Sequence, residues 1–181
     1  MRILFVRHAE STGNAEHRLQ GRKEYGLSEL GIWQAERLRD RFVSEELSPT
    51  HAYSSPMVRA TETARIVMEP WPVRQRIDGD LIEIDIGDGS GLTEEEFEAK
   101  FPGIGKWKAK AAQIALMPGA ESLYNCRIRA TRVIERLMSK HREKDTVVAF
   151  SHGAILAHIV SELLGTKRSW GLGANNTAVF D

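Results

Sequence analysis

The stretch that decides the fold is Arg2-Ile3-Leu4-Phe5-Val6-Arg7-His8-Ala9-Glu10-Ser11, in which four apolar residues run directly into an arginine and a histidine. A short apolar run with β-branched and aromatic residues is typical of a buried strand. Arg7 and His8 would then lie at its carboxyl end, the edge at which open α/β sheets bind ligands. Arg7 offers a fork of donors suited to phosphate oxygens, and the His8 ring can act as a nucleophile or base. Taken alone, the dipeptide also fits an exposed histidine beside a solvated arginine.

Composition limits the classes of protein and partner. The 181 residues, of which 41% are hydrophobic, suit one domain spanning 1–181. With 25 basic and 25 acidic residues the formal charge is zero, which argues against nucleic acid or an anionic membrane as a partner. Residues 78–100 hold nine acids against one lysine, and residues 101–144 hold ten bases against three acids. Solvated helix faces are the favoured interpretation of both runs, with a binding patch as the alternative.

Cysteine usage and hydropathy indicate a compartment. Cys126 is the only cysteine, so no internal disulfide can form, and its place on an apolar helix face predicts a role in the core. The run Ile3 to Val6 is too short for a secretory signal, and no later run is long enough to span a bilayer. A soluble cytoplasmic protein is expected.

Apolar runs alternate with stretches of helical periodicity along the rest of the chain. Residues 11–27 read as a loop at the edge of the sheet. Extended segments are predicted at 51–54, 73–77, 81–84, 146–150 and 177–180. Helices are predicted from a Ser28 cap to Leu47, from a Ser55 cap through Pro56 to Met68, and over 94–100, 106–116, 121–142 and 154–164. This order predicts an α/β fold, a three-layer, doubly wound, largely parallel sheet with residues 87–118 as an inserted helical lid.

Three strand ends should converge on one crevice in this topology. They carry Arg7 and His8, then Ser54-Ser55 ahead of a helix bearing Arg59, and finally Ser151-His152-Gly153. Two arginines and two histidines around one point make an anion site, which can stabilise a phosphoryl group without metal. Glu83, in a nearby extended segment, is a candidate general acid.

Four motifs now resemble, in order, those of the histidine phosphatase superfamily, in its phosphoglycerate mutase-like branch. They are Arg7-His8-Ala9-Glu10-Ser11, Ser54-Ser55-Pro56-Met57-Val58-Arg59-Ala60, Gly119-Ala120-Glu121-Ser122 and Ser151-His152-Gly153. Leu81-Ile82-Glu83 and Asn176 also fit, so the resemblance covers nearly the whole chain.

The resemblance implies a role for each catalytic residue. His8 would attack phosphorus and form a phosphohistidine, while a backbone carbonyl holds its other ring N–H. Arg7, Arg59 and His152 would surround the equatorial oxygens of the phosphoryl group. Glu83 would protonate the leaving alkoxide and later accept a proton from water.

The substrate-binding residues implied are Asn14, Gln20, Gly21 and Gly153. The Asn14 amide would donate to the substrate, Gln20-Gly21 would line the entrance, and Gly153 would follow the second histidine at the site. Neither a metal nor another cofactor is expected, because His17, His51, His141 and His158 show no ligand spacing and are interpreted as structural or surface residues.

Each assignment has an alternative. Arg59 could pair with Glu62 on a helix surface, and His152 could be a satisfied core histidine. Glu83 has four acidic rivals: Glu10, Glu24, Asp85 and Asp88.

Three departures from the family pattern also stand out. Ala9 replaces a glycine, which is harmless if its φ is negative. The stretch 24–28 and the absence of a basic residue in 154–157 alter the surroundings of the substrate rather than the phosphoryl-binding core.

The reaction depends on what accepts the phosphoryl group. Mutases of this family tend to carry a longer insertion and a C-terminal tail, whereas Asp181 follows the last predicted strand, so hydrolysis is favoured. The expected enzyme is a phosphomonoester hydrolase acting on a small phosphorylated metabolite, a sugar phosphate or a phosphorylated acid. The alternatives are a phosphoglycerate mutase-like phosphotransferase and a phosphate-ligand sensor without turnover. A homodimer is left open.

Overall fold

The computed structural model describes residues 1–102, 117–166 and 173–181 of the chain. These residues contain a five-stranded sheet of order β3-β2-β4-β1-β5. β1 pairs in parallel with β4, which pairs in parallel with β2, and β2 pairs in parallel with β3. Only β5 is antiparallel, so the predicted largely parallel sheet is confirmed. The strands are β1 (Arg2–Arg7), β2 (His51–Ser54), β3 (Gln75–Ile77), β4 (Thr146–Ser151) and β5 (Val179–Phe180).

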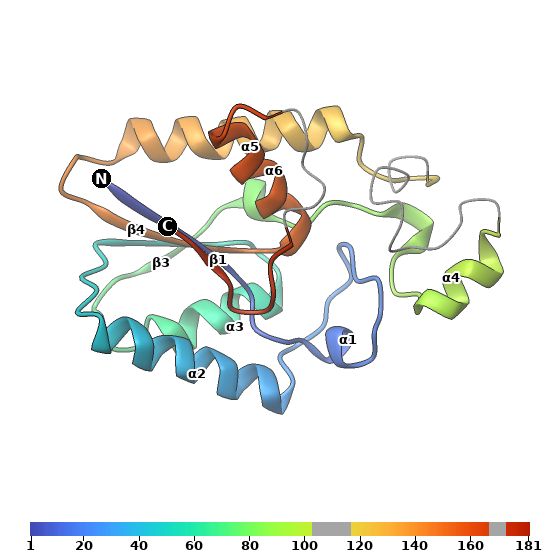
Figure 1. Ribbon diagram of the computed structural model, residues 1–181, viewed down its shortest axis with the longest axis horizontal. Coiled ribbons are helices and arrows are strands. Elements are labelled where there is room, and N and C mark those ends of the chain that lie inside the picture. The colour runs from blue at the N-terminus through green and yellow to red at the C-terminus, as the bar shows by residue number, and fades with distance from the viewer. Residues whose placement is uncertain (103–116, 167–172) are drawn as a thin grey trace.

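Helices cover both faces of the sheet, which confirms the three-layer architecture (Figure 1). One face carries α2 (Glu29–Ser44) and α3 (Val58–Val67), and the other carries α5 (Leu123–Lys140) and α6 (Gly153–Leu163). Alternate residues of β4 serve the two layers, because successive strand side chains point to opposite faces. Val147 belongs to the core beneath α5 and α6, whereas Val148 belongs to the core beneath α2 and α3. Cys126 lies fully buried in the first of these cores, as expected.

Local capping explains where most helices begin. The Ser28 hydroxyl accepts a bond from Gly31 N at 3.0 Å, and Ser122 accepts one from Asn125 N at 3.1 Å. Thr93 and Glu96 form a capping box at the start of α4 (Glu94–Lys100). The predicted helix 94–100 is therefore confirmed, while the predicted helix 106–116 lies outside the described residues.

The junction after β2 differs from the prediction. Ser55 was expected to cap a helix starting at Pro56, but α3 begins at Val58 with Met57 as its N-cap. The Ser55 hydroxyl accepts a hydrogen bond from Met57 N at 3.3 Å, and it also lies 2.7 Å from Nε2 of His152, which follows β4. Ser55, which the local sequence predicts as the N-cap of α3, therefore orients the predicted site residue His152.

Other predicted segments are wrong or shorter than expected. The segment 11–27, predicted as a loop, contains a short helix, α1 (Thr12–Ala15). A capping box of Ser11 and Asn14 forms the start of this helix. The segment predicted as extended from Leu81 begins inside a 3₁₀ turn, η1 (Gly79–Leu81). The strands predicted at 73–77 and 177–180 are shorter than expected, because only Gln75–Ile77 (β3) and Val179–Phe180 (β5) pair in the sheet.

The described parts of the predicted lid lie beyond the carboxyl ends of the parallel strands, as α1 does (Figure 1). They comprise a 3₁₀ turn, η2 (Gly87–Gly89), and α4. An isolated bridge joins Ile86 to Ala120, so the two ends of the segment meet. Gly87 has a φ of +54°, and a Cβ there would lie 2.0 Å from Pro118 O. This closure therefore requires a glycine.

Hydropathy along the helices bears on membrane insertion. No helix in the described parts of the chain is long and apolar enough to cross a membrane.

Candidate active site

A cavity of about 210 Å³ lies at the carboxyl edge of the sheet. Seven of the nine predicted site residues line it: Arg7, His8, Asn14, Gln20, Gly21, Arg59 and Glu83. Five further lining residues were not predicted: Arg18, Leu19, Ile84, Ile86 and Ala154. Three arginines against one carboxylate make this cavity suited to an anion.

His8 is held in one orientation just beyond the end of β1. Its ring is 3% exposed, and its Nδ1 donates to Ala9 O at 2.7 Å, which leaves the lone pair on Nε2. Burial, followed by the charges of Arg59 and Arg7, lowers the pKa of His8 well below the ordinary 6.5. The ring is therefore a neutral nucleophile at neutral pH. Ala9 is not among the residues with positive φ, so the replacement of glycine is harmless here.

Two guanidinium groups lie on the cavity wall and are anchored by backbone carbonyls. Arg59, only 1% exposed, donates to Lys23 O at 3.0 Å and to Gly21 O at 2.9 Å. Arg7 donates to Ala174 O. The alternative surface pair of Arg59 with Glu62 is thus wrong, because the side chain points inward to the entrance loop. Fixed cations of this kind stabilise charge without reorganising during reaction.

His152 lies beside His8 rather than on the cavity wall. The two ring centroids are 5.1 Å apart, and His152 is fully buried. Its Nε2 meets Ser55 Oγ at 2.7 Å, while its Nδ1 has no hydrogen-bond partner among the described residues. Burial, and then the charge of His8, lowers the pKa of His152 well below 6.5. Gly153 is not among the lining residues either, although it lies close to Arg7: a Cβ on Gly153 would be 3.5 Å from Arg7 Nε.

Glu83 is oriented by the start of α6. Its Oε1 accepts from Ile155 N at 3.0 Å and its Oε2 accepts from Ala154 N at 3.2 Å. A carboxylate at a helix N-terminus satisfies backbone donors that lack partners within the helix. Among the described residues, no other acid lines the cavity. The rivals are turned elsewhere: Glu10 accepts from the Ser28 hydroxyl and Glu24 accepts from Val58 N.

Polar residues of the entrance loop are fixed by one another. Asn14 Oδ1 accepts from Ser11 N at 3.2 Å and from Asn176 Nδ2 at 3.3 Å. The Nδ2 end of Asn14 is then the group that can donate to a ligand. Gln20 Oε1 lies 2.8 Å from the Ser11 hydroxyl, and Gly21 adopts a φ of +51°.

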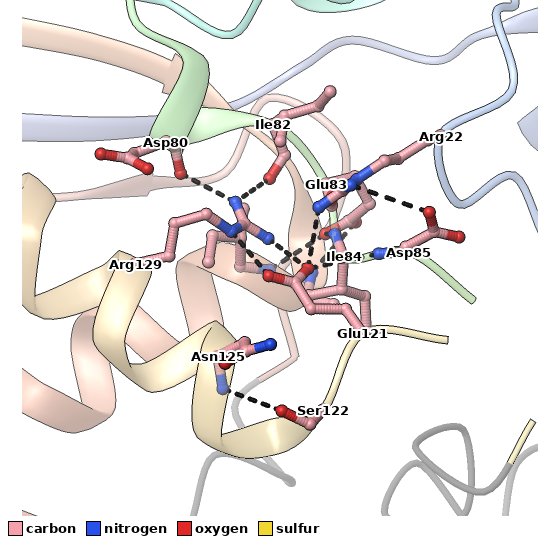
Figure 2. Close-up of polar contacts among 12 residues, drawn as sticks. Arg22, Asp80, Ile82, Glu83, Ile84, Asp85, Glu121, Ser122, Asn125 and Arg129 are labelled. Carbon is pink, nitrogen blue, oxygen red and sulfur yellow. Dashed lines mark hydrogen bonds and ion pairs between the residues drawn. The ribbon is translucent and has the colours of Figure 1, made fainter. Parts of the chain in front are cut away.

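An Arg–Glu–Arg network holds the segment that carries Glu83 (Figure 2). Arg129 grips the Glu121 carboxylate with two bonds of 2.9 and 2.8 Å and also donates to Ile82 O. Arg22 donates to Glu121 Oε2 at 3.0 Å and to Glu83 O at 3.1 Å. Arg129 thus holds the Ile82 carbonyl and Arg22 holds the Glu83 carbonyl, and the Glu121 carboxylate binds both arginines.

The charge of Glu121 is stabilised by this network. Burial acts to raise the pKa of Glu121, but the hydrogen bonds and charge of Arg129, helped by Arg22, lower it below the ordinary 4.5. Glu121 belongs to the motif Gly119-Ala120-Glu121-Ser122, which contributed to the family resemblance, but the sequence assigned this residue no role because its partners are not visible there.

Comparisons with known proteins identify the family of this chain. Residues 3–180 match the family model described as "Histidine phosphatase superfamily (branch 1)". The chain is 33% identical over 184 residues to "Phosphoserine phosphatase 1" of Hydrogenobacter thermophilus, covering 98% of this chain and 84% of that protein. It is also 33% identical over 156 residues to "Phosphoglycerate mutase-like protein 4" of Arabidopsis thaliana, covering 85% and 67%.

A solved structure gives the same answer for the fold. The structure titled "Bacillus stearothermophilus YhfR" superposes with a TM-score of 0.87 at 26% identity, covering 99% of this chain and 90% of that one. The match to the family model spans the predicted catalytic residues, which are Arg7, His8, Arg59, Glu83 and His152. The chain belongs to the histidine phosphatase superfamily, branch 1.

Proposed function

We propose that this chain hydrolyses small phosphomonoesters through a phosphohistidine formed on His8. The observation that carries the proposal is the state of His8: a buried, neutral ring with Nδ1 held by Ala9 O. Its free Nε2 is available to attack phosphorus in line, and the Nδ1 contact stabilises the positive charge that develops on the ring.

Arg7 and Arg59 hold the transferring group in this mechanism. Both line the cavity with His8, and a phosphoryl group gathers charge on its equatorial oxygens in the transition state. Asn14 adds a neutral donor through its amide. The His152 ring lies 5.1 Å from that of His8 between centroids, and in this proposal it contacts an equatorial oxygen of the phosphoryl group.

Glu83 is proposed as the general acid and then the base. It shares the cavity with His8, and its carboxyl group is fixed by Ala154 N and Ile155 N. From this position Glu83 would give a proton to the leaving alkoxide and later accept one from the attacking water.

The proposed substrate class is a phosphorylated acid or sugar phosphate. Arg18 also lines the cavity. Its guanidinium pairs with Glu16 and Glu96, and by exchanging these partners it can meet a second anionic group such as a carboxylate. The relative named as a phosphoserine phosphatase supports the same class. Lys106, Lys108 and Lys110 of the segment 87–118 lie outside the described residues, and the lid role of 87–118 remains a proposal.

A mutase is the second candidate, because the name of the Arabidopsis relative points to phosphoglycerate mutase. The two reactions share phosphoenzyme formation and differ in the acceptor. Phosphate release from a panel of phosphoesters in EDTA, with His8→Ala as control, separates them. Hydrolysis predicts release that His8→Ala abolishes. Isomerisation of a phosphoglycerate primed by a bisphosphate, without release, would instead establish the mutase, and binding without either reaction would indicate a sensor.

A cytoplasmic location and a homodimer complete the proposal. The single buried cysteine supports a reducing compartment. Light scattering of the purified chain tests the homodimer.

A further inference from the structure

Three side chains with metal-binding atoms meet at the end of the sheet opposite the active site. They are His51 at the start of β2, His141 at the C-cap of α5 and Asp145 just before β4. One ligand atom from each lies within 4.8 Å of the others. The connection from α5 to β4 lies at the opposite end of the sheet from α1 and α4 (Figure 1). This cluster therefore plays no part in the proposed phosphoryl chemistry.

The contacts of Thr50 fix the tautomer of His51. The Thr50 hydroxyl donates to Thr146 O at 3.1 Å and accepts from Thr146 N at 3.1 Å. Its proton is then engaged, so the 2.9 Å contact with His51 Nδ1 requires that nitrogen to donate. His51 consequently carries its lone pair on Nε2, the form in which histidine binds a metal.

The His141 ring has one satisfied and one unsatisfied nitrogen. Its side chain is 2% exposed, and Nε2 lies 3.0 Å from the Tyr53 hydroxyl. Nδ1 is buried without a hydrogen-bond partner among the described residues and lies 3.8 Å from Asp145 Oδ2. When Nε2–H donates to the Tyr53 oxygen, the Nδ1 lone pair faces the carboxylate. A cation between them would satisfy both groups.

Asp145 is fixed in the connection between α5 and β4. Its Oδ2 accepts a hydrogen bond from Arg142 N at 2.8 Å.

We propose that His51 Nε2, His141 Nδ1 and the Asp145 carboxylate bind one zinc ion, with water as the fourth ligand. Two imidazoles and a carboxylate are a donor set that Zn²⁺ accepts in tetrahedral geometry. Bonds of about 2.0–2.1 Å place tetrahedral ligand atoms about 3.4 Å apart. The separations of up to 4.8 Å therefore close by small side-chain rotations of the partly exposed His51 and Asp145.

The hydrogen bonds of Thr50 and Tyr53 support the assignment. Ligating histidines donate their other ring N–H to an oxygen, which orients the ring, and both rings here have such an oxygen within 3.0 Å. The ion would join the end of α5 to the amino ends of β2 and β4. Its effect is on stability rather than on the chemical step.

Titration of the EDTA-stripped full chain with Zn²⁺, and with Co²⁺ as a spectroscopic probe, tests this site. His8→Ala serves as the background, because it removes the active-site imidazole as a competing ligand. One equivalent of zinc should bind and raise the melting temperature, and the Co²⁺ complex should show a tetrahedral absorption spectrum. His141→Gln and Asp145→Asn should each weaken binding at least tenfold. The exposed histidine variant His17→Asn should bind as the background does.

Tyr53→Phe keeps the ring and removes only the oxygen that orients His141, so it should weaken binding by about 10–100-fold in a protein that still folds. The proposal is overturned if the background protein binds no stoichiometric zinc, or if His141→Gln and Tyr53→Phe bind zinc as tightly as it does. Phosphatase activity of the native chain in EDTA is measured separately, so loss of the zinc site and loss of the proposed function are distinguishable.

Discussion

At His8, burial and two neighbouring guanidinium groups act in the same direction on the ring. All three lower its pKa, so the nucleophile does not need to lose a proton at neutral pH. The Ala9 carbonyl then decides which nitrogen attacks. The sequence placed Arg7 beside His8, but the depth of burial and the approach of Arg59 depend on the folded entrance loop.

The pH dependence of kcat/KM tests this state of the ring. Because the pKa of His8 is lowered, the ring stays neutral as pH falls through 6.5, and the rate should decline only well below that value. Arg7→Gln removes one of the charges that lower the pKa of His8, so the fall of the rate on the acid side should begin at a higher pH. The same variant should lose about 10²–10³-fold in kcat. A limb that shifts with the phosphate pKa of the substrate belongs to the substrate. A limb at 6.5 that is independent of the substrate would contradict the assignment.

At the scale of elements, local sequence signals were sufficient where an element is built from its own residues. β1 and β4 were predicted because each is an apolar run, α2 and α4 because Ser28 and Thr93 can cap them, and α5 because its apolar residues fall on one face. The Ser55 contact and the Arg22–Glu121–Arg129 network involve residues distant in the chain, so periodicity could not reveal them. The same applies to the cluster of His51, His141 and Asp145.

Glu121 is a positioning residue for the segment that carries Glu83. Glu121→Gln should leave Arg129 with an uncompensated buried charge and cost about 3–5 kcal/mol of stability. It should also slow hydrolysis of alkyl phosphates more than of aryl phosphates, because a good leaving group needs no general acid.

Glu83→Gln provides the reference pattern for this test. Rates are measured on folded Glu121→Gln protein for substrates whose leaving groups differ in pKa. The rate should fall more steeply with rising leaving-group pKa than in the native chain, as it should in Glu83→Gln. An equal loss for alkyl and aryl substrates would leave Glu121 with a purely structural role.

Close packing of α2 against Glu10, in the segment that follows His8, gives a second prediction at this scale. A Cβ on Gly31 would lie 1.9 Å from Glu10 O, so Gly31→Ala should displace the loop or the helix and cost about 1–3 kcal/mol. Gly79→Ala is the matched control, since no atom lies within 4 Å of its added Cβ. Denaturant unfolding of both variants measures the difference, and equal stabilities would contradict the packing argument.

Across the whole molecule, the acidic and basic runs of the sequence are partly paired with one another. Arg136 contacts Asp78 at 2.7 Å and Asp80 at 3.0 Å, and Arg132 also contacts Asp80. The prediction that both runs are solvated helix faces is therefore wrong for Asp78 and Asp80, because these acids at the start of η1 form ion pairs with arginines of α5. The local charge asymmetry partly reflects a contact between these elements.

Buried neutral histidines make the stability of the molecule depend on pH. The pKa values of His8, His141, His152 and His158 are all lowered by burial as the main cause. Their unfolded forms bind protons near pH 6.5 while the folded forms do not. Their contribution is therefore complete above pH 6.5 and is lost as pH falls from there through the folded pKa values.

The free energy of unfolding, measured in EDTA, should thus decrease as pH falls from 6.5 to 5. The decrease should be up to about 1.4 kcal/mol per pH unit for each histidine. His158→Gln, at a buried position outside the catalytic cavity, should reduce this slope. A stability that is flat between pH 7 and 5 would show that the buried rings are not neutral.

The most direct measurement is covalent trapping of the phosphoryl group. Reactions with labelled phosphoester are quenched in denaturant at alkaline pH, because the P–N bond of a phosphohistidine hydrolyses in acid, and peptides are then mapped at alkaline pH. The label should lie on His8 in the native chain and in Arg7→Gln, at a lower rate in the latter. His8→Ala should carry no label. Label retained covalently on the His8→Ala protein, or located on another residue of the native chain, would contradict the account.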